Sequence, residues 1–325
     1  MTASWEIREG DVLDRLREMD DGSVHCVITS PPYFHLRDFG VEGQIGLEPT
    51  LDEYVAKLVE VFAEVKRVLR DDGTLWLNLG DSYAGSWGAQ SRGATDSTST
   101  LTGAPLHGRQ IAAHPKGSKT GSIPAGAPFK AKDMLGVPWM TAFALRADGW
   151  YLRRDIIWSK PNAMPESVAD RPGSAHEYVF LMSKSAAYYY DHVAVRQPDG
   201  GRGSGNGFDE RLEHRLTQNG VGKKEPWLPG AGRNLRSVWT IPTRPYPVAH
   251  FATFPPKLIE PMVRAGCPPA GVVLDPFAGS GTTLQVAIAN GRSAIGIELN
   301  PEYAELCRLR LAGVTPPLFD TLEPR

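Results

Sequence analysis

The 325-residue sequence is poor in cysteine and carries almost no net charge. Its three cysteines, Cys26, Cys267 and Cys307, lie far apart without a C-x-x-C pair, which argues against a disulfide framework and a zinc site. A net charge of −2 gives no general attraction for a polyanion, so any nucleic-acid surface must be local. No apolar stretch approaches a membrane span, and the N-terminus is unlike a signal peptide. We therefore expect a cytoplasmic protein without a membrane partner or a bound metal.

Strand and helix signals alternate along most of the chain. Residues 1–83 predict strands at 5–8, 24–29 and 74–79, a short helix at 12–19, and a long amphipathic helix that begins at a Thr50–Glu53 capping box and ends at Gly73. Farther on we expect a helix near 138–147, strands near 151–158, 177–183 and 187–191, and a strand–turn–helix–strand–helix series over 271–313. This alternation predicts an α/β fold whose mostly parallel sheet is covered by helices on both faces.

Two long irregular stretches interrupt the alternation. Residues 84–133 are rich in Gly, Ser, Thr and Pro, and between His107 and Lys132 they contain basic but no acidic residues. Residues 196–236 include GGRGSGNG and several arginines and lysines. Such long loops in a compact protein are usually functional or disordered. The chain therefore divides into core parts at 1–83, 134–195 and 237–325, with insertions at 84–133 and 196–236.

The stretch GVVLDPFAGSGTT, residues 271–283, indicates a nucleoside site. Asp275 ends a buried strand, and Gly279 and Gly281 permit a tight turn whose backbone N–H groups can approach a ligand. Glu298 ends the next strand, at the distance where an acid can accept both hydroxyls of a ribose. The third glycine of the dinucleotide pattern is replaced by Leu284, and Asp275 would repel a pyrophosphate but attract an amino group. S-adenosylmethionine therefore fits better than NAD.

A second motif, Ser30-Pro31-Pro32-Tyr33, follows the expected strand 24–29. The two prolines fix their own φ, donate no N–H, and favour extended geometry in the residue before each of them. The strand therefore ends in a rigid, acceptor-rich edge beside an aromatic ring.

Together, TSPPY and DPFAGSGTT resemble the DNA amino-methyltransferases of the circularly permuted β group, in which an S/D-P-P-Y catalytic motif precedes the cofactor motif. The resemblance covers nearly all of residues 5–312. It implies a Rossmann-like, S-adenosylmethionine-dependent methyltransferase fold with irregular target-recognition insertions. Residues 1–83 and 134–195 would form the catalytic half and 237–325 the cofactor half. Residues 84–133 would be a basic loop that contacts DNA, and 196–236 the target-recognition segment.

The resemblance also implies site residues. For the cofactor, the resemblance implies Glu298 at the ribose and Asp11 at the adenine, where a plain helix cap is the alternative role of Asp11. Thr253, Phe254 and Pro255 would contact the methionine end, and a merely structural role is their alternative. The remaining cofactor residues form the turn. The full cofactor set is Asp11, Thr253, Phe254, Pro255, Asp275, Phe277, Ala278, Gly279, Ser280, Gly281 and Glu298. For Asp81 and Lys160, in NLGDSYAG and RRDIIWSKPN, function and scaffold stay equally open.

In this family the catalytic set, here Ser30, Pro31, Pro32 and Tyr33, acts on the exocyclic amine of a flipped base. The Ser30 hydroxyl oxygen and the Pro31 carbonyl would accept the two N–H bonds, and Tyr33 would stack on the base. Serine at position 30 favours cytosine N4, with adenine N6 as the alternative. Methylation of RNA or of a glutamine amide, and an inactive DNA-binding regulator, are further alternatives.

Double-stranded DNA is the expected partner. A cognate restriction endonuclease, and the choice between monomer and homodimer, are left open. Arginine and lysine can position the phosphate backbone or read base edges. The candidate DNA-binding residues are Arg37, Arg109, Lys116, Lys119, Arg202, Lys223, Lys224 and Arg233.

Overall fold

The computed structural model describes residues 3–36, 38–84, 129–130, 132–166, 168–198, 232–243 and 254–314. These residues include an eight-stranded sheet with the strand order β1-β8-β7-β2-β3-β5-β4-β6. The strands are β1 (Trp5–Glu9), β2 (Val24–Thr29), β3 (Leu69–Leu79), β4 (Tyr151–Ser159), β5 (His176–Ser183), β6 (Val238–Thr240), β7 (Val272–Asp275) and β8 (Ser293–Glu298). Strand β5 runs antiparallel to both neighbours, and every other neighbouring pair is parallel.

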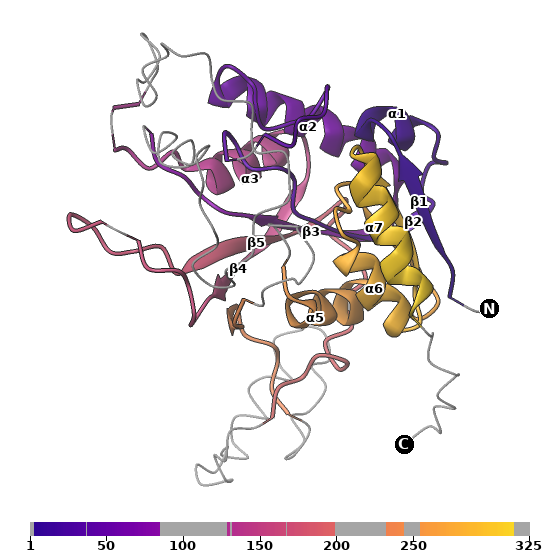
Figure 1. The fold of residues 1–325 in the computed structure, drawn as a ribbon. Helices are drawn as coiled ribbons and strands as arrows, with labels where there is room; N and C mark the ends of the chain where they lie inside the picture. Colours follow the sequence, from indigo (N-terminus) through magenta and orange to yellow (C-terminus); the bar gives the residue numbers. More distant parts are fainter. Residues whose placement is uncertain are drawn as a thin grey trace, which may run out of the picture. The chain divides into compact units, whose positions relative to one another are not determined.

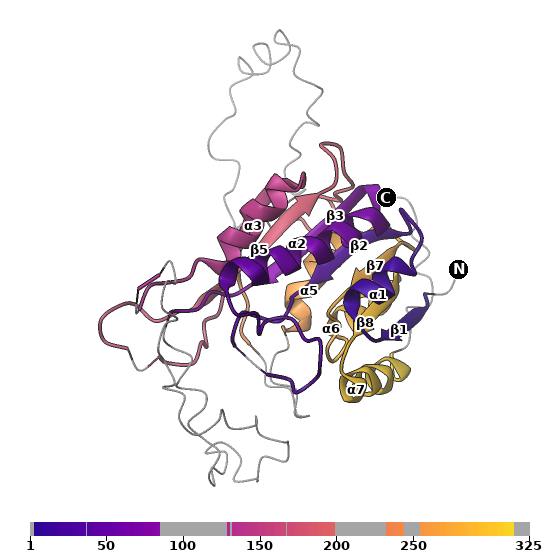
Figure 2. The same cartoon turned by 90° about the horizontal axis from the view of Figure 1, so that it is seen from above.

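Helices cover both faces of this sheet, as the sequence predicts. They are α1 (Val12–Arg17), α2 (Leu51–Val68), α3 (Val137–Ala147), α5 (Pro256–Gly266), α6 (Thr282–Ala289) and α7 (Pro301–Ala312). Figures 1 and 2 show α1, α2 and α3 on one face and α5 and α6 on the other. Helix α7 packs beside the edge formed by β1 and β8. The α/β prediction with a mostly parallel sheet is confirmed.

Helix α2 shows why the local sequence gives this structure. The Thr50 hydroxyl accepts a hydrogen bond from the Glu53 amide at 3.2 Å, and the Glu53 carboxylate accepts one from the Thr50 amide at 3.1 Å. This reciprocal capping box fixes the first turn. The face with Leu58, Phe62 and Val65 is fully buried against the core, so burial of an apolar stripe stabilises the helix.

Three features of the structure differ from the sequence prediction. The long helix ends at Val68 rather than Gly73, because β3 already begins at Leu69 and pairs with Val24 before a bulge shifts the register. Residues 187–191 form no strand, since the Tyr189 amide donates to the Asp72 carbonyl of that bulge. The short edge strand β6, which pairs with β4, was not predicted.

The contacts divide the chain into two units. One comprises Met1–Tyr190 with Ser237–Arg325 and contains the whole sheet. The other is Asp191–Arg236, whose described residues include an antiparallel bridge between Gln197 and Arg233. The predicted recognition segment 196–236 falls within this second unit.

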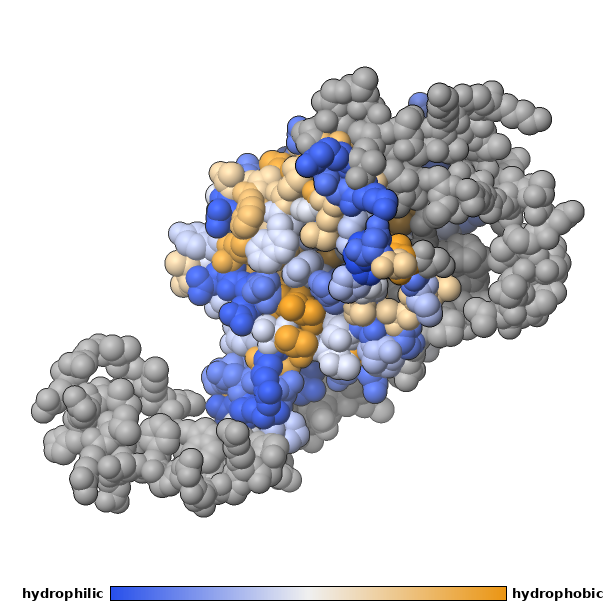
Figure 3. Space-filling view, turned by 90° about the vertical axis from the view of Figure 1, so that its left-hand side faces the viewer, coloured by the Kyte–Doolittle hydropathy of each residue, from blue (hydrophilic) through white to orange (hydrophobic). Residues whose placement is uncertain are grey.

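The surface of the described residues mixes apolar and polar side chains. Figure 3 shows small apolar areas bordered by hydrophilic residues on one face. Exposed large apolar side chains include Met134, Phe143 and Met164. Among the described residues, no helix is long and apolar enough to cross a membrane.

The sheet has a topological switch point between β2 and β7. From β2 the chain passes through α2 to β3 on one side, and from β7 it passes through α6 to β8 on the other. In open α/β sheets, ligands bind outside the carboxyl ends of the strands at such a point. The two sequence motifs directly follow these two strands.

Candidate active site

A buried carboxylate joins the two motif-bearing strands. Asp275 is 1% exposed, and its Oδ1 accepts hydrogen bonds from the Thr29 hydroxyl at 2.7 Å and from the Phe277 amide at 3.1 Å. Its Oδ2 accepts one from the Thr283 hydroxyl at 2.7 Å. Burial raises the pKa of Asp275 to about 6, and these three hydrogen bonds offset only part of that effect. Asp275 thus connects β2, β7 and α6 at one point.

The Gly-rich turn after Asp275 needs its glycines. Gly279 and Gly281 have φ values of 52° and 77°, in the left-handed region that side chains disfavour. A Cβ on Gly281 would also collide with the sulfur of Cys307. The turn is closed by hydrogen bonds from the Ala278 amide to the Ile297 carbonyl and from the Gly281 amide to the Ala278 carbonyl. Ala278, Ser280 and Gly281 are buried, whereas Gly279 is partly exposed, so Gly279 is where a ligand can approach the backbone of the turn closely.

Glu298, at the end of β8, holds this turn. Its Oε2 accepts a 2.7 Å hydrogen bond from the Gly279 amide and its Oε1 a 2.9 Å bond from the Asn300 amide. Burial is the main cause that raises the pKa of Glu298 above its usual value. Each carboxylate oxygen keeps a further lone pair, so Glu298 can accept two more hydrogen bonds.

Asp11 lies at the adjacent strand end. β1 pairs with β8, Glu9 is the register partner of Glu298, and the Gly10 amide donates to the Glu298 carbonyl at 2.9 Å. The Asp11 carboxylate caps α1 by accepting from the Leu13 amide at 2.9 Å. Asp11 therefore caps helix α1, and it does so at the same edge of the sheet as Glu298.

The Ser30–Tyr33 segment is fixed by contacts with other elements. The Tyr54 hydroxyl of α2 donates to the Pro32 carbonyl at 2.8 Å. The Ser30 hydroxyl donates to Oη of Tyr33 at 3.4 Å, and Tyr33 donates to the Glu177 carboxylate of β5 at 2.9 Å. Burial and the negative charge of Glu177 raise the pKa of Tyr33 well above its usual value.

Glu177 also meets the two neighbouring strands. Its Oε2 accepts a 3.1 Å hydrogen bond from the Asn78 side chain on β3, and its Oε1 pairs with the Lys160 ammonium directly after β4. The Lys160 ammonium also lies 4.3 Å from the ring centroid of Trp158. Lys160 therefore belongs to the polar cluster beside Tyr33.

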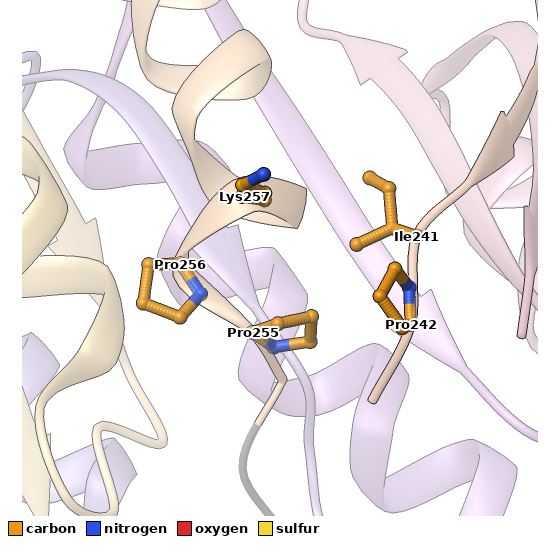
Figure 4. Close-up of a pocket in the computed structure, with 5 residues that line it drawn as sticks. All are labelled: Ile241, Pro242, Pro255, Pro256 and Lys257. Carbon is orange, nitrogen blue, oxygen red and sulfur yellow. The ribbon is translucent and has the colours of Figure 1, made fainter. Parts of the chain in front are cut away.

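The start of α5 completes the described site. The Thr74 hydroxyl in the middle of β3 donates to the carbonyl of Gly266, at the end of α5. Pro255 and Pro256, at the start of α5, face Ile241 and Pro242, which follow the carboxyl end of β6, so the start of α5 lies at the carboxyl edge of the sheet. A pocket of about 70 Å³ lies there, lined by Ile241, Pro242, Pro255, Pro256 and Lys257. Figure 4 shows residues 255–257 opposite residues 241–242. The pocket has room for only a few water molecules and is too small for a nucleoside.

Of the candidate DNA-binding residues, the structure describes Arg233, and the others lie outside the described residues. Arg233 is exposed, and its backbone exchanges two 2.8 Å hydrogen bonds with Gln197. The residues outside are Arg37, Arg109, Lys116, Lys119, Arg202, Lys223 and Lys224, together with the cofactor candidate Thr253.

The structure also reveals site residues that the sequence prediction missed. Thr29 and Thr283 stand inside the quoted motifs, so their positions beside Asp275 could have been noticed. Arg310 of α7 donates to the Ser280 carbonyl at 3.0 Å and to the Thr282 hydroxyl at 2.9 Å. Glu177 lies outside the motifs of the sequence, and its position beside Tyr33 depends on the antiparallel pairing of β5 with β3.

A family model described as "DNA methylase" (N6_N4_Mtase) matches residues 24–308. The chain belongs to this family. Type II methyltransferase M.XycI of Xanthomonas campestris pv. cyanopsidis is 47% identical over 305 residues, which cover 94% of this chain and 87% of that protein. The enzyme is an S-adenosylmethionine-dependent DNA methyltransferase of the restriction-modification kind that acts on an exocyclic amino group, N4 of cytosine or N6 of adenine.

Solved structures share the fold. PvuII DNA methyltransferase (cytosine-N4-specific) matches with a TM-score of 0.60 and 19% identity, over 95% of this chain and 87% of that chain. TTHA0409 from Thermus thermophilus, complexed with S-adenosyl-L-methionine, matches with a TM-score of 0.55 and 24% identity, over 97% of both chains. The predicted methyltransferase fold and the predicted cofactor are confirmed.

Proposed function

We propose that this methylase is a β-group enzyme that methylates cytosine N4, with the Ser30–Tyr33 segment as its catalytic motif. The observation that carries this proposal is the 2.7 Å hydrogen bond between Thr29 and Asp275. Ser30 directly follows Thr29, and the Gly-rich turn directly follows Asp275. An acceptor-rich segment and a nucleoside-binding turn therefore begin at neighbouring strand ends.

The described residues fit S-adenosylmethionine. Gly279 leaves the turn partly open to a ligand, and Glu298 has two free acceptor positions for the ribose hydroxyls. Asp275 already accepts three hydrogen bonds, and since a carboxylate has about four acceptor positions, one is left for the α-amino group. Asp11 would bind the adenine, and Phe254 and Pro255 the methionine end. When bound, the cofactor supplies an electrophilic methyl group on a sulfonium.

The Ser30–Tyr33 segment would prepare the target amine. The Ser30 hydroxyl and the Pro31 carbonyl accept its two N–H bonds and direct the nitrogen lone pair away from the ring. As positive charge develops on the nitrogen, the same two acceptors stabilise it. Stacking of Tyr33 on the flipped base is worth roughly 1–3 kcal/mol and offsets part of the unpairing cost. The Tyr54 hydrogen bond to the Pro32 carbonyl holds this segment in place.

The DNA would be read by the two insertions, 84–133 and 196–236. Their arginines and lysines are suited to phosphate and base-edge contacts. A cognate restriction endonuclease that recognises the same site would be the functional partner, and both proteins would work in the cytoplasm. Serine at position 30 supports cytosine over adenine as the target.

The test is direct identification of the product. The protein is incubated with S-adenosylmethionine and mixed-sequence DNA, and the digested nucleosides are identified by mass spectrometry, with a reaction lacking the cofactor as control. We expect N4-methylcytosine. N6-methyladenine alone would overturn the cytosine assignment, and cofactor binding without any modified nucleoside would favour an inactive DNA-binding regulator.

A further inference from the structure

We infer that Glu177 is a positioning residue that acts through Tyr33 and keeps the Ser30 hydroxyl oxygen available as an acceptor for the target amine. The inference rests on the proposed function, because it concerns how Ser30 meets its substrate. It adds a residue from β5 and a defined direction of hydrogen bonding to the Ser30–Tyr33 motif.

The direction follows from the chemistry of the three groups. An ionised carboxylate only accepts hydrogen bonds, so the Tyr33 hydroxyl must donate its single proton to Glu177, 2.9 Å away. The Tyr33 oxygen then acts toward Ser30 only as an acceptor, and the Ser30 hydroxyl donates to it at 3.4 Å. The single proton of Ser30 is thereby turned toward Tyr33.

This direction matters because an amino group offers two N–H donors. A serine hydroxyl that is free to rotate could point its own proton at the amine and compete with the required contact. With that proton committed to Tyr33, both lone pairs of the Ser30 oxygen remain for the target.

Glu177 is itself held in place from both sides. Asn78 donates to Oε2 at 3.1 Å and also to the Tyr178 carbonyl at 3.0 Å, so its amide is fixed. Lys160 pairs with Oε1, and the Lys160 and Glu177 side chains are each only 17% exposed. The carboxylate therefore presents Oε2 to Tyr33 in one orientation.

The competing interpretation is that Glu177 only neutralises Lys160. In that case, loss of its charge would act on stability and would be independent of the Tyr33 hydroxyl. A double-mutant cycle separates the two, because residues that act through one another give non-additive effects. Tyr33→Phe retains the stacking ring and removes only the hydroxyl.

The experiment compares the full-length wild type, Tyr33→Phe, Glu177→Gln and the double variant. The rate of methyl transfer to DNA is measured in a single turnover with saturating cofactor, together with the cofactor Kd and the melting temperature. Glu64→Gln serves as control, because Glu64 forms a similarly half-buried ion pair with Arg67 away from the site.

We expect each single substitution to slow methyl transfer by about 10- to 100-fold, as for loss of a hydrogen bond to a charged group. The double variant should be no slower than the slower single variant, and the control and the cofactor Kd should stay near the wild-type values. If the rate loss of the double variant equals the product of the two single losses, the inference is overturned. If Glu177→Gln fails to fold, an unchanged rate for Tyr33→Phe overturns it. A wild type that transfers no methyl group would instead overturn the proposed function and this inference with it.

Discussion

The Thr29 hydroxyl donates a 2.7 Å hydrogen bond to the Asp275 carboxylate, although 246 positions separate the two residues in the chain. The bond exists because β2 and β7 are parallel neighbours, with Val27 paired to Leu274. It connects the strand before Ser30 to the strand before the Gly-rich turn. The site therefore depends on how well Asp275 is held.

Removal of the second hydroxyl that binds Asp275 should weaken the fold. Thr283 is fully buried, and Thr283→Val keeps its shape but deletes the 2.7 Å hydrogen bond. We expect the free energy of unfolding, measured with urea, to fall by about 1–3 kcal/mol. Thr141→Val is the matched control, because Thr141 is equally buried and its hydroxyl has no hydrogen-bond partner among the described residues. Equal losses for both variants would refute the role of the Asp275 contact.

Asp275 should make stability depend on pH. Its pKa is about 6 in the folded protein, above the ordinary value near 3.8, so the folded state binds the proton more tightly than the unfolded state. Its contribution to stability is therefore present below about pH 4 and is lost as the pH rises through 6. An Asp275→Asn variant has no group at this position that can titrate.

From pH 4 to pH 7, the wild type should therefore lose about 2–3 kcal/mol of unfolding free energy relative to Asp275→Asn. Urea titrations of both proteins across this range measure the shift. A difference that stays constant over the range would show that the Asp275 carboxyl does not change its proton affinity on folding.

Gly80 should be needed for the position of Tyr33. A Cβ at this residue would lie 2.8 Å from Cε2 of Tyr33 and 3.3 Å from Cγ of Glu177, so Gly80→Ala must displace the ring. We expect kcat to fall about tenfold or more, because a small misplacement of reacting groups is costly, while the cofactor Kd stays unchanged. Gly173→Ala is the control, since its Cβ would meet only one atom, 4.0 Å away. An unchanged kcat for Gly80→Ala would argue against a fixed Tyr33.

The beginning of α2 was easier to predict than its end. The Thr50–Glu53 capping box is a local signal and gave the start of α2 correctly. Its end at Val68 depends on the pairing of Leu69 with Val24, a contact that the sequence near Gly73 does not reveal. Likewise, the aromatic run at 187–191 looked like a strand, but Tyr190 packs its ring on Trp76 instead.

The site could be predicted as far as its motifs extend. Asp275, Gly279 and Glu298 are linked by short-range spacing within one β–turn–α–β unit, so the sequence alone brings them together. Glu177 and Lys160 come from strands whose order and direction are set by tertiary pairing. Their ion pair and their contact with Tyr33 therefore needed the structure.

The central claim is that two separate segments supply one methyl-transfer site, one for the amine and one for the cofactor. The most direct test compares Ser30→Ala and Glu298→Ala, with Glu260→Ala on the exposed side of α5 as control. For each variant, the cofactor Kd is measured by calorimetry and the rate of methyl transfer in a single turnover. We predict that Ser30→Ala loses about 10-fold or more in rate with an unchanged Kd, whereas Glu298→Ala weakens the Kd by about 10- to 100-fold. An unchanged Kd for Glu298→Ala, or an unchanged rate for Ser30→Ala, would contradict the account.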